Sequence, residues 1–110
     1  MNTREKGNIG EDKAVEFLIK NNYQIVTRNF YSRFGEIDII AKKGDILHFI
    51  EVKSGDNFQP IYNVTYSKLQ KIIKTLNLYL KKYKLNNPYQ IDVITIHKGE
   101  IEFIKNISMW

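Results

Sequence analysis

The chain contains no cysteine, so disulfide bonds, zinc–thiolate sites and cysteine nucleophiles are excluded. Its two histidines and scattered serines do not suggest a hydrolase triad. The apolar runs are strand-sized, well short of the roughly 20 residues that a membrane-spanning helix needs. Residues 1–7 also lack the hydrophobic core of a signal peptide. We therefore expect a soluble protein of the cytoplasm that does not enter a membrane.

The composition that remains is that of a small, folded and basic domain. The 110 residues are 43% hydrophobic, which is typical of a globule rather than a disordered chain, and we expect a single domain over residues 1–110. Lysine and arginine number 17 against 12 acidic residues, which gives a net charge of +5. A basic surface suits a polyanion such as nucleic acid, although small basic proteins without such a partner share this composition.

Hydrophobic periodicity predicts two helices and five strands. In chain order we expect a helix over 10–21, strands over 23–30, 36–42 and 46–53, a loop over 54–63, a helix over 65–84, and strands over 89–96 and 101–107. Tight turns make the first three strands an antiparallel meander, and the second helix crosses over to bring the fourth strand alongside it. The predicted fold class is α/β, with a mixed five-stranded sheet flanked by helices in the order α-β-β-β-α-β-β.

Three charged residues interrupt the second and third strands, where apolar side chains are expected. Asp38 lies in the second strand, and Glu51 and Lys53 lie in the third. Glu51 and Lys53 share a face because strand side chains alternate, and a hairpin centred near Gly44 places Asp38 across from the Glu51 region. Since an unpaired buried charge is costly, we expect the three side chains to converge near the strand ends.

These residue types suit a divalent cation bound against a phosphodiester. Mg²⁺ prefers carboxylate oxygens and usually takes one or two protein carboxylates together with substrate phosphate, which Asp38 and Glu51 can supply. Lys53 would orient a nucleophile or stabilise an anionic transition state. Glu11, on the inward stripe of the first helix, is a candidate fourth member. The alternatives are an internal salt-bridge cluster and, for Glu11, a charge that interacts favourably with the helix dipole.

The same residues belong to a longer ordered pattern. Its parts are Gly10–Ala14, Tyr23–Val26, Arg28–Phe30, Gly35–Ile40, Phe49–Lys53, Lys68, Tyr79–Leu80 and Asp92–Val93. Over nearly the whole chain this pattern resembles the YraN-like family of uncharacterised bacterial proteins. That family is similar to the PD-(D/E)xK nuclease superfamily, particularly the archaeal Holliday-junction resolvases, in which an acidic helix residue, an Asp and a Glu-x-Lys occur in this order.

The resemblance implies a restriction-endonuclease-like core with Mg²⁺ or Mn²⁺ as cofactor. It implies that Glu11, Asp38 and Glu51 are metal ligands within the catalytic set. It also makes the Val52 carbonyl a further candidate ligand and Lys53 the catalytic lysine. A shared fold does not by itself establish activity.

The chain departs from the family pattern at two places. Ile37 stands where the superfamily motif has its proline, a replacement that removes no chemical group from the site. Ser54 and Gly55 follow Lys53, where relatives often carry a basic residue two positions after the lysine. The second departure puts a contact to the substrate backbone in doubt and leaves the metal site intact.

Three basic residues outside the acidic set are candidate nucleic-acid contacts. Arg28 and Arg33 lie beside or in the turn before the second strand. Lys68 lies near the start of the second helix, close to where the acidic site is expected, and is also the best candidate for a residue that supports that site. In the alternative interpretation they are solvated surface residues. Asp92 interrupts the fourth strand and is either an active-site residue or a paired core carboxylate. His48 alternates onto the face of its strand opposite the acidic site, where we expect a structural role.

The function that this set predicts is a Mg²⁺- or Mn²⁺-dependent DNA endonuclease, with branched or structured DNA as one class of substrate. A second hypothesis is a non-catalytic nucleic-acid-binding or adaptor protein that keeps a nuclease-like fold. A third is a small interaction domain whose acidic cluster is an internal salt bridge. Enzymes that cut two strands often form homodimers, but no surface stripe in the sequence identifies an interface.

Overall fold

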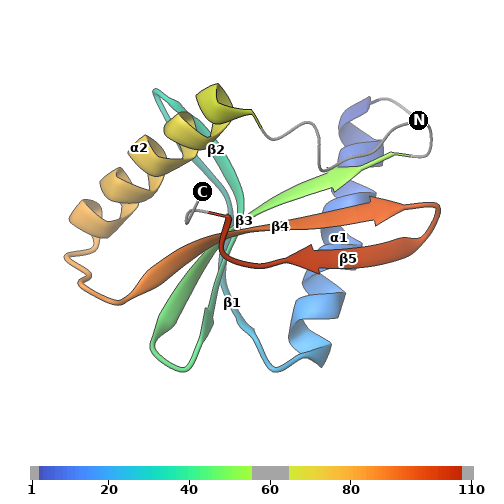
Figure 1. Cartoon of the computed structure of the whole chain (residues 1–110), viewed down its shortest axis with the longest axis horizontal. Helices are drawn as coiled ribbons and strands as arrows, with labels where there is room; N and C mark the ends of the chain where they lie inside the picture. Colours follow the sequence, from blue (N-terminus) through green and yellow to red (C-terminus); the bar gives the residue numbers. More distant parts are fainter. Residues whose placement is uncertain (1–2, 56–64, 108–110) are drawn as a thin grey trace.

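In the computed structural model, which describes residues 3–55 and 65–107, two helices flank one five-stranded sheet (Figure 1). The elements are α1 (Thr3–Lys20), β1 (Gln24–Ser32), β2 (Gly35–Lys43), β3 (Ile46–Ser54), α2 (Tyr66–Lys82), β4 (Tyr89–His97) and β5 (Glu100–Ile104). The predicted order and fold class are confirmed. The expected loop over 54–63 lies largely outside the described residues. No helix in the described ranges is long and apolar enough to cross a membrane.

The sheet has the predicted mixed topology. Its strand order is β1-β2-β3-β4-β5, and β1, β2 and β3 pair antiparallel as a meander. The crossover through α2 places β4 parallel to β3, while β5 returns antiparallel to β4. The parallel pair therefore occupies the inside of the sheet, where both of its faces are covered, as parallel strands require.

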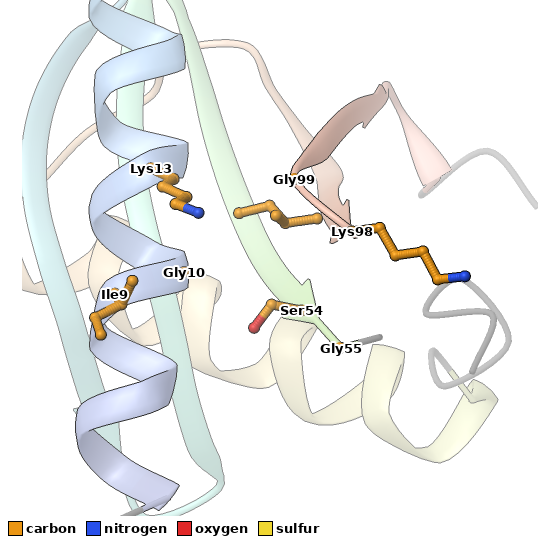
Figure 2. Close-up of a pocket in the computed structure, with 8 residues that line it drawn as sticks. Ile9, Gly10, Lys13, Ser54, Gly55, Lys98 and Gly99 are labelled. Atoms are coloured by element: carbon orange, nitrogen blue, oxygen red, sulfur yellow. The ribbon is translucent and has the colours of Figure 1, made fainter. Parts of the chain in front are cut away.

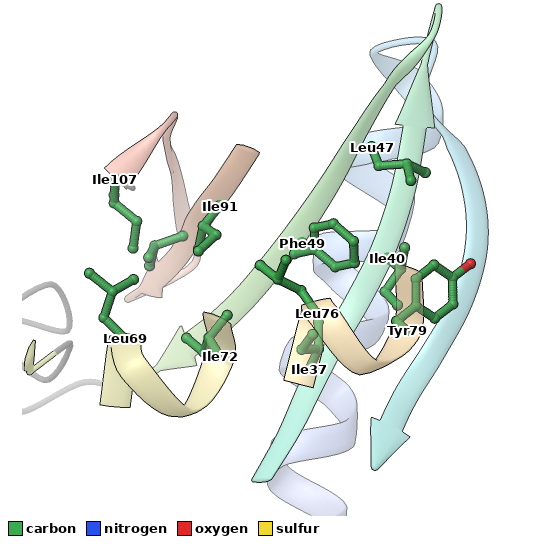
Figure 3. Packing of buried hydrophobic residues seen from close by; sticks show 11 residues of the cluster. Ile37, Ile40, Leu47, Phe49, Leu69, Ile72, Leu76, Tyr79, Ile91 and Ile107 are labelled. Carbon is green, nitrogen blue, oxygen red and sulfur yellow. The ribbon is translucent and has the colours of Figure 1, made fainter. Parts of the chain in front are cut away.

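Each helix covers one face of the sheet with its own apolar cluster. On α2, Leu69 and Leu76 pack with Phe49 of β3 (Figure 3). On α1, Leu18 packs with Ile50 of β3. Because residues 49 and 50 point to opposite faces of one strand, the two clusters form two layers of core. A polar residue of β3 therefore faces either the α1 layer or the α2 layer, depending on whether its position is even or odd.

The first helix is longer than predicted. It begins at Thr3 rather than at residue 10. The prediction missed the first turns because the apolar spacing that indicated the helix starts only near Ala14. Its end agrees with the prediction. Asn21 donates a side-chain hydrogen bond to the Phe17 carbonyl, and Asn22 adopts φ 68°, a left-handed conformation that ends helices.

The last strand is shorter than predicted and ends at Ile104 rather than at residue 107. The backbone N–H of Asn106 donates to the Asp92 carboxylate at 2.7 Å, and Asn106 has φ 60°. This contact turns the chain out of the strand. The second helix also differs slightly from its predicted range, since Thr65 accepts a hydrogen bond from the Lys68 backbone N–H and acts as its N-cap.

Candidate metal centre

Asp38 and Glu51 come together across β2 and β3. The register pairs Ile39 with Ile50, and continuing it by one residue brings Asp38 opposite Glu51, as the hairpin predicted. The Val52 backbone N–H donates to Asp38 Oδ2 at 2.8 Å, which fixes the direction of the Asp38 side chain. Both carboxylates therefore lie at the same end of the two strands, where the hydrogen-bonded pairing of β2 with β3 stops.

Two lysines accompany the carboxylates. Lys53 follows Glu51 on the same face of β3, and Lys68 reaches in from the first turn of α2, with its Nζ 3.6 Å from Glu51 Oε2. Burial lowers the pKa of Lys53, and the positive charge of nearby Lys68 lowers it further. The structure thus brings Lys68, which its position near the start of the helix predicted to lie close to the site, into contact with Glu51 of the acidic pair.

The electrostatics of the pair are unfavourable without a cation. Glu51 is 3% exposed, and burial followed by the charge of Asp38 raises its pKa to about 8, against the opposing effect of Lys68 and Lys53. Burial also raises the pKa of Asp38, although the Val52 N–H and the two lysines oppose the shift. Two buried carboxylates that share a site disfavour each other's ionisation.

One oxygen of this site lacks a partner. Within the described part of the chain, Glu51 Oε1 is a buried side-chain oxygen with no hydrogen-bond donor. Buried polar atoms are nearly always satisfied, so an orphaned oxygen calls for a specific explanation, such as an ion. A divalent cation next to Asp38 and Glu51 would both satisfy this oxygen and neutralise the paired charges. The residues present therefore fit a metal ion.

Glu11 is buried as predicted, at 6% exposed, but it is bound to other partners. Its Oε1 accepts from Arg28 Nε at 2.9 Å and from Asn29 Nδ2 at 3.2 Å. Arg28 also binds Asp12 at 2.7 Å. Among residues 3–55 and 65–107, no group of three or more acidic, histidine or cysteine side chains is arranged to hold a metal ion. Glu11 as a metal ligand therefore stays a prediction.

The two arginines predicted to contact nucleic acid have different partners in the structure. Arg28, a predicted nucleic-acid contact, has its guanidinium engaged by Glu11 and Asp12. Arg33 lies in the β1–β2 turn with its guanidinium carbon 4.8 Å from the centre of the Phe34 ring. Sequence reasoning missed Asn29, whose φ of 55° is unusual inside a strand and which points its amide to Glu11.

The predicted structural role of His48 is confirmed by its neighbours, and Asp92 is its partner. His48 Nδ1 lies 2.7 Å from Asp92 Oδ2, and the imidazole packs edge-on against Tyr23 with ring centres 5.0 Å apart. The other Asp92 oxygen accepts from Gln90 Nε2 at 2.8 Å and from the Asn106 N–H. Asp92 is thus a paired core carboxylate.

A separate hollow of about 150 Å³ lies between α1 and the ends of β3 and β4. Its lining includes Lys13, Ser54 and Ile96. Asp38, Glu51 and the two lysines beside them do not line it. Figure 2 shows the Ser54 hydroxyl turned toward α1 at this hollow. A Cβ on Gly10 would lie 2.8 Å from Ser54 Oγ, so glycine at position 10 allows the helix to approach the strand.

Comparison with known proteins assigns the chain to a family. The sequence pattern of the Uncharacterised protein family UPF0102 matches residues 10–96. The chain belongs to this family. The confirmed membership agrees with the YraN-like resemblance, and the matched segment contains the acidic pair and both lysines of the candidate metal centre.

Several relatives in the UPF0102 family match over nearly their whole length. A UPF0102 protein of Wolinella succinogenes is 51% identical over 107 residues, which cover 97% of this chain and 99% of the relative. One from Helicobacter hepaticus is 49% identical and covers 99% of both chains. One from Helicobacter pylori strain HPAG1 is 50% identical over 96% of this chain and 92% of its own.

Proposed function

We propose that this UPF0102 protein is a Mg²⁺- or Mn²⁺-dependent endonuclease that hydrolyses phosphodiester bonds of DNA in the cytoplasm. The observation that carries the proposal is Glu51 Oε1, a buried oxygen that has no partner among residues 3–55 and 65–107 and lies beside a second carboxylate. Lys68 pairs with the other oxygen, Oε2, so this ion pair alone leaves Oε1 unsatisfied within the described residues. The PD-(D/E)xK resemblance supports the same assignment, because its ordered Asp and Glu-x-Lys fall on Asp38, Glu51 and Lys53.

Asp38 and Glu51 would hold the cation. Two carboxylates are a common protein contribution for Mg²⁺, with substrate oxygens and water completing its shell. The Val52 N–H faces β2 and binds Asp38, and the carbonyl of the same residue faces the same neighbouring strand in a regular sheet. That carbonyl is therefore the third candidate ligand. When bound, the cation would activate water and neutralise charge that develops on the phosphate.

The two lysines have distinct parts in this proposal. Lys53, on the same face as Glu51, would donate to an oxygen of the scissile phosphate and stabilise the charge that forms there. Lys68 binds Glu51 Oε2, so it orients that carboxylate and leaves Oε1 directed at the cation. The lowered pKa of Lys53 follows from burial and from this second lysine.

Glu11 enters the proposal as the fourth acidic residue. Its contacts with Arg28 and Asn29 are both made through Oε1. Arg28 would bind a DNA phosphate, the role predicted for it, once it is released from Glu11 and Asp12. Arg33 is the other predicted backbone contact. Branched or structured DNA as the substrate, and a homodimer as the active form, remain part of the proposal.

The test is cleavage by purified protein of linear, flapped and four-way-junction DNA with Mg²⁺ or Mn²⁺. We expect metal-dependent cutting of at least one substrate. We expect Asp38→Ala and Lys53→Ala to reduce the rate by about 100-fold or more, the scale of losing one electrostatic stabiliser. Asp45→Ala, an exposed carboxylate in the β2–β3 turn, is the matched control and should cut like the parent.

Two outcomes decide against the catalytic proposal. One is that no substrate is cut with either metal, and the other is that the Asp38→Ala and Lys53→Ala variants cut as fast as the parent. Binding of DNA that needs no metal and survives Glu51→Gln, without cleavage, would establish the non-catalytic alternative. The contact of Glu11 with Arg28 is the observation that favours that alternative, since it takes one predicted ligand away from the site.

A further inference from the structure

The β1–β2 turn is fixed against the side of α2. Ser32 Oγ and Thr75 Oγ1 are hydrogen-bonded at 2.8 Å, and Thr75 is fully buried. Ser32 Oγ also accepts from the Phe34 N–H at 3.0 Å. This pair of hydroxyls joins the β1–β2 turn to the middle of α2. It therefore fixes how the exposed side chains of the turn are placed relative to those of the helix.

Three cations gather where the turn meets the helix, and we call them the basic strip: Arg33, Lys71 and Lys74. All three are exposed. The Arg33 guanidinium lies 4.8 Å and the Lys74 Nζ 5.3 Å from the centre of the Phe34 ring, within the range of cation–π attraction. Lys71 lies beside the turn, since a Cβ on Gly35 would be 3.9 Å from its Cβ.

The basic strip continues from the candidate metal centre. Lys68 contacts Glu51, and Lys71 and Lys74 follow it at intervals of three residues along α2. At a rise of 1.5 Å per residue, each step advances the positive charge by about 4.5 Å. Phosphates of one DNA strand follow at about 3.4 Å along the duplex axis. A strand with one phosphate at the acidic pair therefore brings its next phosphates within reach of the strip.

The position of the strip separates it from an ordinary solvated helix face. Lys81 and Lys82 are equally exposed lysines of the same helix, but at 1.5 Å per residue they lie about 20 Å from Lys68. The aromatic ring inside the strip is Phe34, and it is engaged with two cations rather than open to a base. Proteins that bind single strands stack bases on open rings, so the strip suits a duplex.

We propose that Arg33, Lys71 and Lys74 bind the phosphate backbone of a double-stranded DNA arm next to the bond at the metal centre. The placement of that bond rests on the proposed function, whereas the contact with duplex DNA does not. The strip would hold the substrate in register without reading its sequence, because phosphate contacts position a duplex and carry no base information.

The test measures the binding of a fluorescent 20-base-pair DNA duplex by fluorescence anisotropy. The measurement is made in EDTA at several KCl concentrations. Cleavage is absent under these conditions, so failure of the nuclease proposal does not affect the result. We expect Arg33→Ala, Lys71→Ala and Lys74→Ala each to weaken binding and to reduce the slope of log affinity against log salt by about 0.9, the value for one lost duplex phosphate contact.

Lys81→Ala is the matched control and should keep the affinity and slope of the parent. Thermal unfolding of each variant confirms that it is folded before binding is compared. Parent protein that does not bind the duplex, strip variants that keep the parent slope, or a Lys81→Ala loss equal to theirs would each overturn the proposal. A single strand bound more tightly than the duplex, with slope changes near 0.7, would overturn the assignment to a duplex arm.

Discussion

Two buried carboxylates on neighbouring strands have opposite environments. Asp92 of β4 is fully buried, and its two oxygens receive donors from His48, Gln90 and the Asn106 backbone. Glu51 of β3 is 3% exposed, yet one of its oxygens has no donor within the described residues. The strands are parallel partners, and Ile50 pairs with Asp92 just before Glu51 pairs with Val93.

The difference separates a carboxylate with a structural role from one for which we propose a function. Burial alone does not distinguish the two residues, because both have lost most of their contact with water. What distinguishes them is whether the protein replaces the lost hydrogen bonds. Around Asp92 it does, and the carboxylate ties β3, β4 and the segment after β5 together. Around Glu51 it supplies Lys68 for Oε2 and a second acid, Asp38, but no donor for Oε1 among the described residues, so a cation or a proton would complete the site.

The largest effect that tests this comparison is on stability. Asp92→Ala removes three hydrogen bonds, including the buried one with His48, so we expect a loss of about 3–5 kcal/mol in the free energy of unfolding. Glu51→Gln should be neutral or stabilising without metal, since it removes a carboxyl group whose raised pKa requires it to take up a proton on folding at neutral pH. Urea unfolding of both variants measures this, and an equal loss in the two would contradict the distinction.

The next effect is stabilisation by metal. If the cation binds the folded acidic pair as proposed, Mg²⁺ or Mn²⁺ at 100 times its dissociation constant should stabilise the parent by about 2.7 kcal/mol. Glu51→Gln and Asp38→Asn should lose most of this gain, whereas an Asp92→Asn variant that stays folded should keep it. Thermal unfolding with and without EDTA shows the result. Equal stabilisation of parent and Glu51→Gln would place the metal elsewhere.

The smallest effect is on the pH dependence of the metal-free protein. The pKa of Glu51 is raised from 4.5 to about 8, so between these values the folded state binds more protons than the unfolded state, and stability falls as pH rises. Asp38, whose pKa is also raised, acts in the same direction. From pH 5 to pH 7 we expect Glu51 alone to cause a loss of about 2.5 kcal/mol, because this range lies between its two pKa values and each pH unit there is worth about 1.36 kcal/mol.

Glu51→Gln is the control for this dependence, because it removes the titrating group and keeps the shape of the side chain. It should flatten most of the slope between pH 5 and pH 8, and saturating Mg²⁺ should do the same in the parent. Denaturant unfolding at each pH provides the measurement. A variant with the full slope of the parent would show that another group titrates in this range.

Much of the fold was predictable because it depends on local patterns. The strand alternation around Glu51 placed it with Lys53, and the turn at Gly44 placed Asp38 across from them, since register follows from a short hairpin. The predicted start of α1 and the predicted end of β5 were wrong for the same reason. Neither boundary is marked by apolar periodicity, and the second is set by a hydrogen bond to Asp92, a residue of another strand.

The sequence by itself determined which charged residues interrupt the strands and in what order they occur, because alternation and turn length act over a few residues. Tertiary structure alone decided which of these charges are satisfied. His48 meets Asp92 across 44 positions, and Arg28 meets Glu11 across 17, contacts that require the elements to pack. The same packing brought Lys68 to Glu51 and, within the part of the chain that the structure describes, left Glu51 Oε1 without a donor.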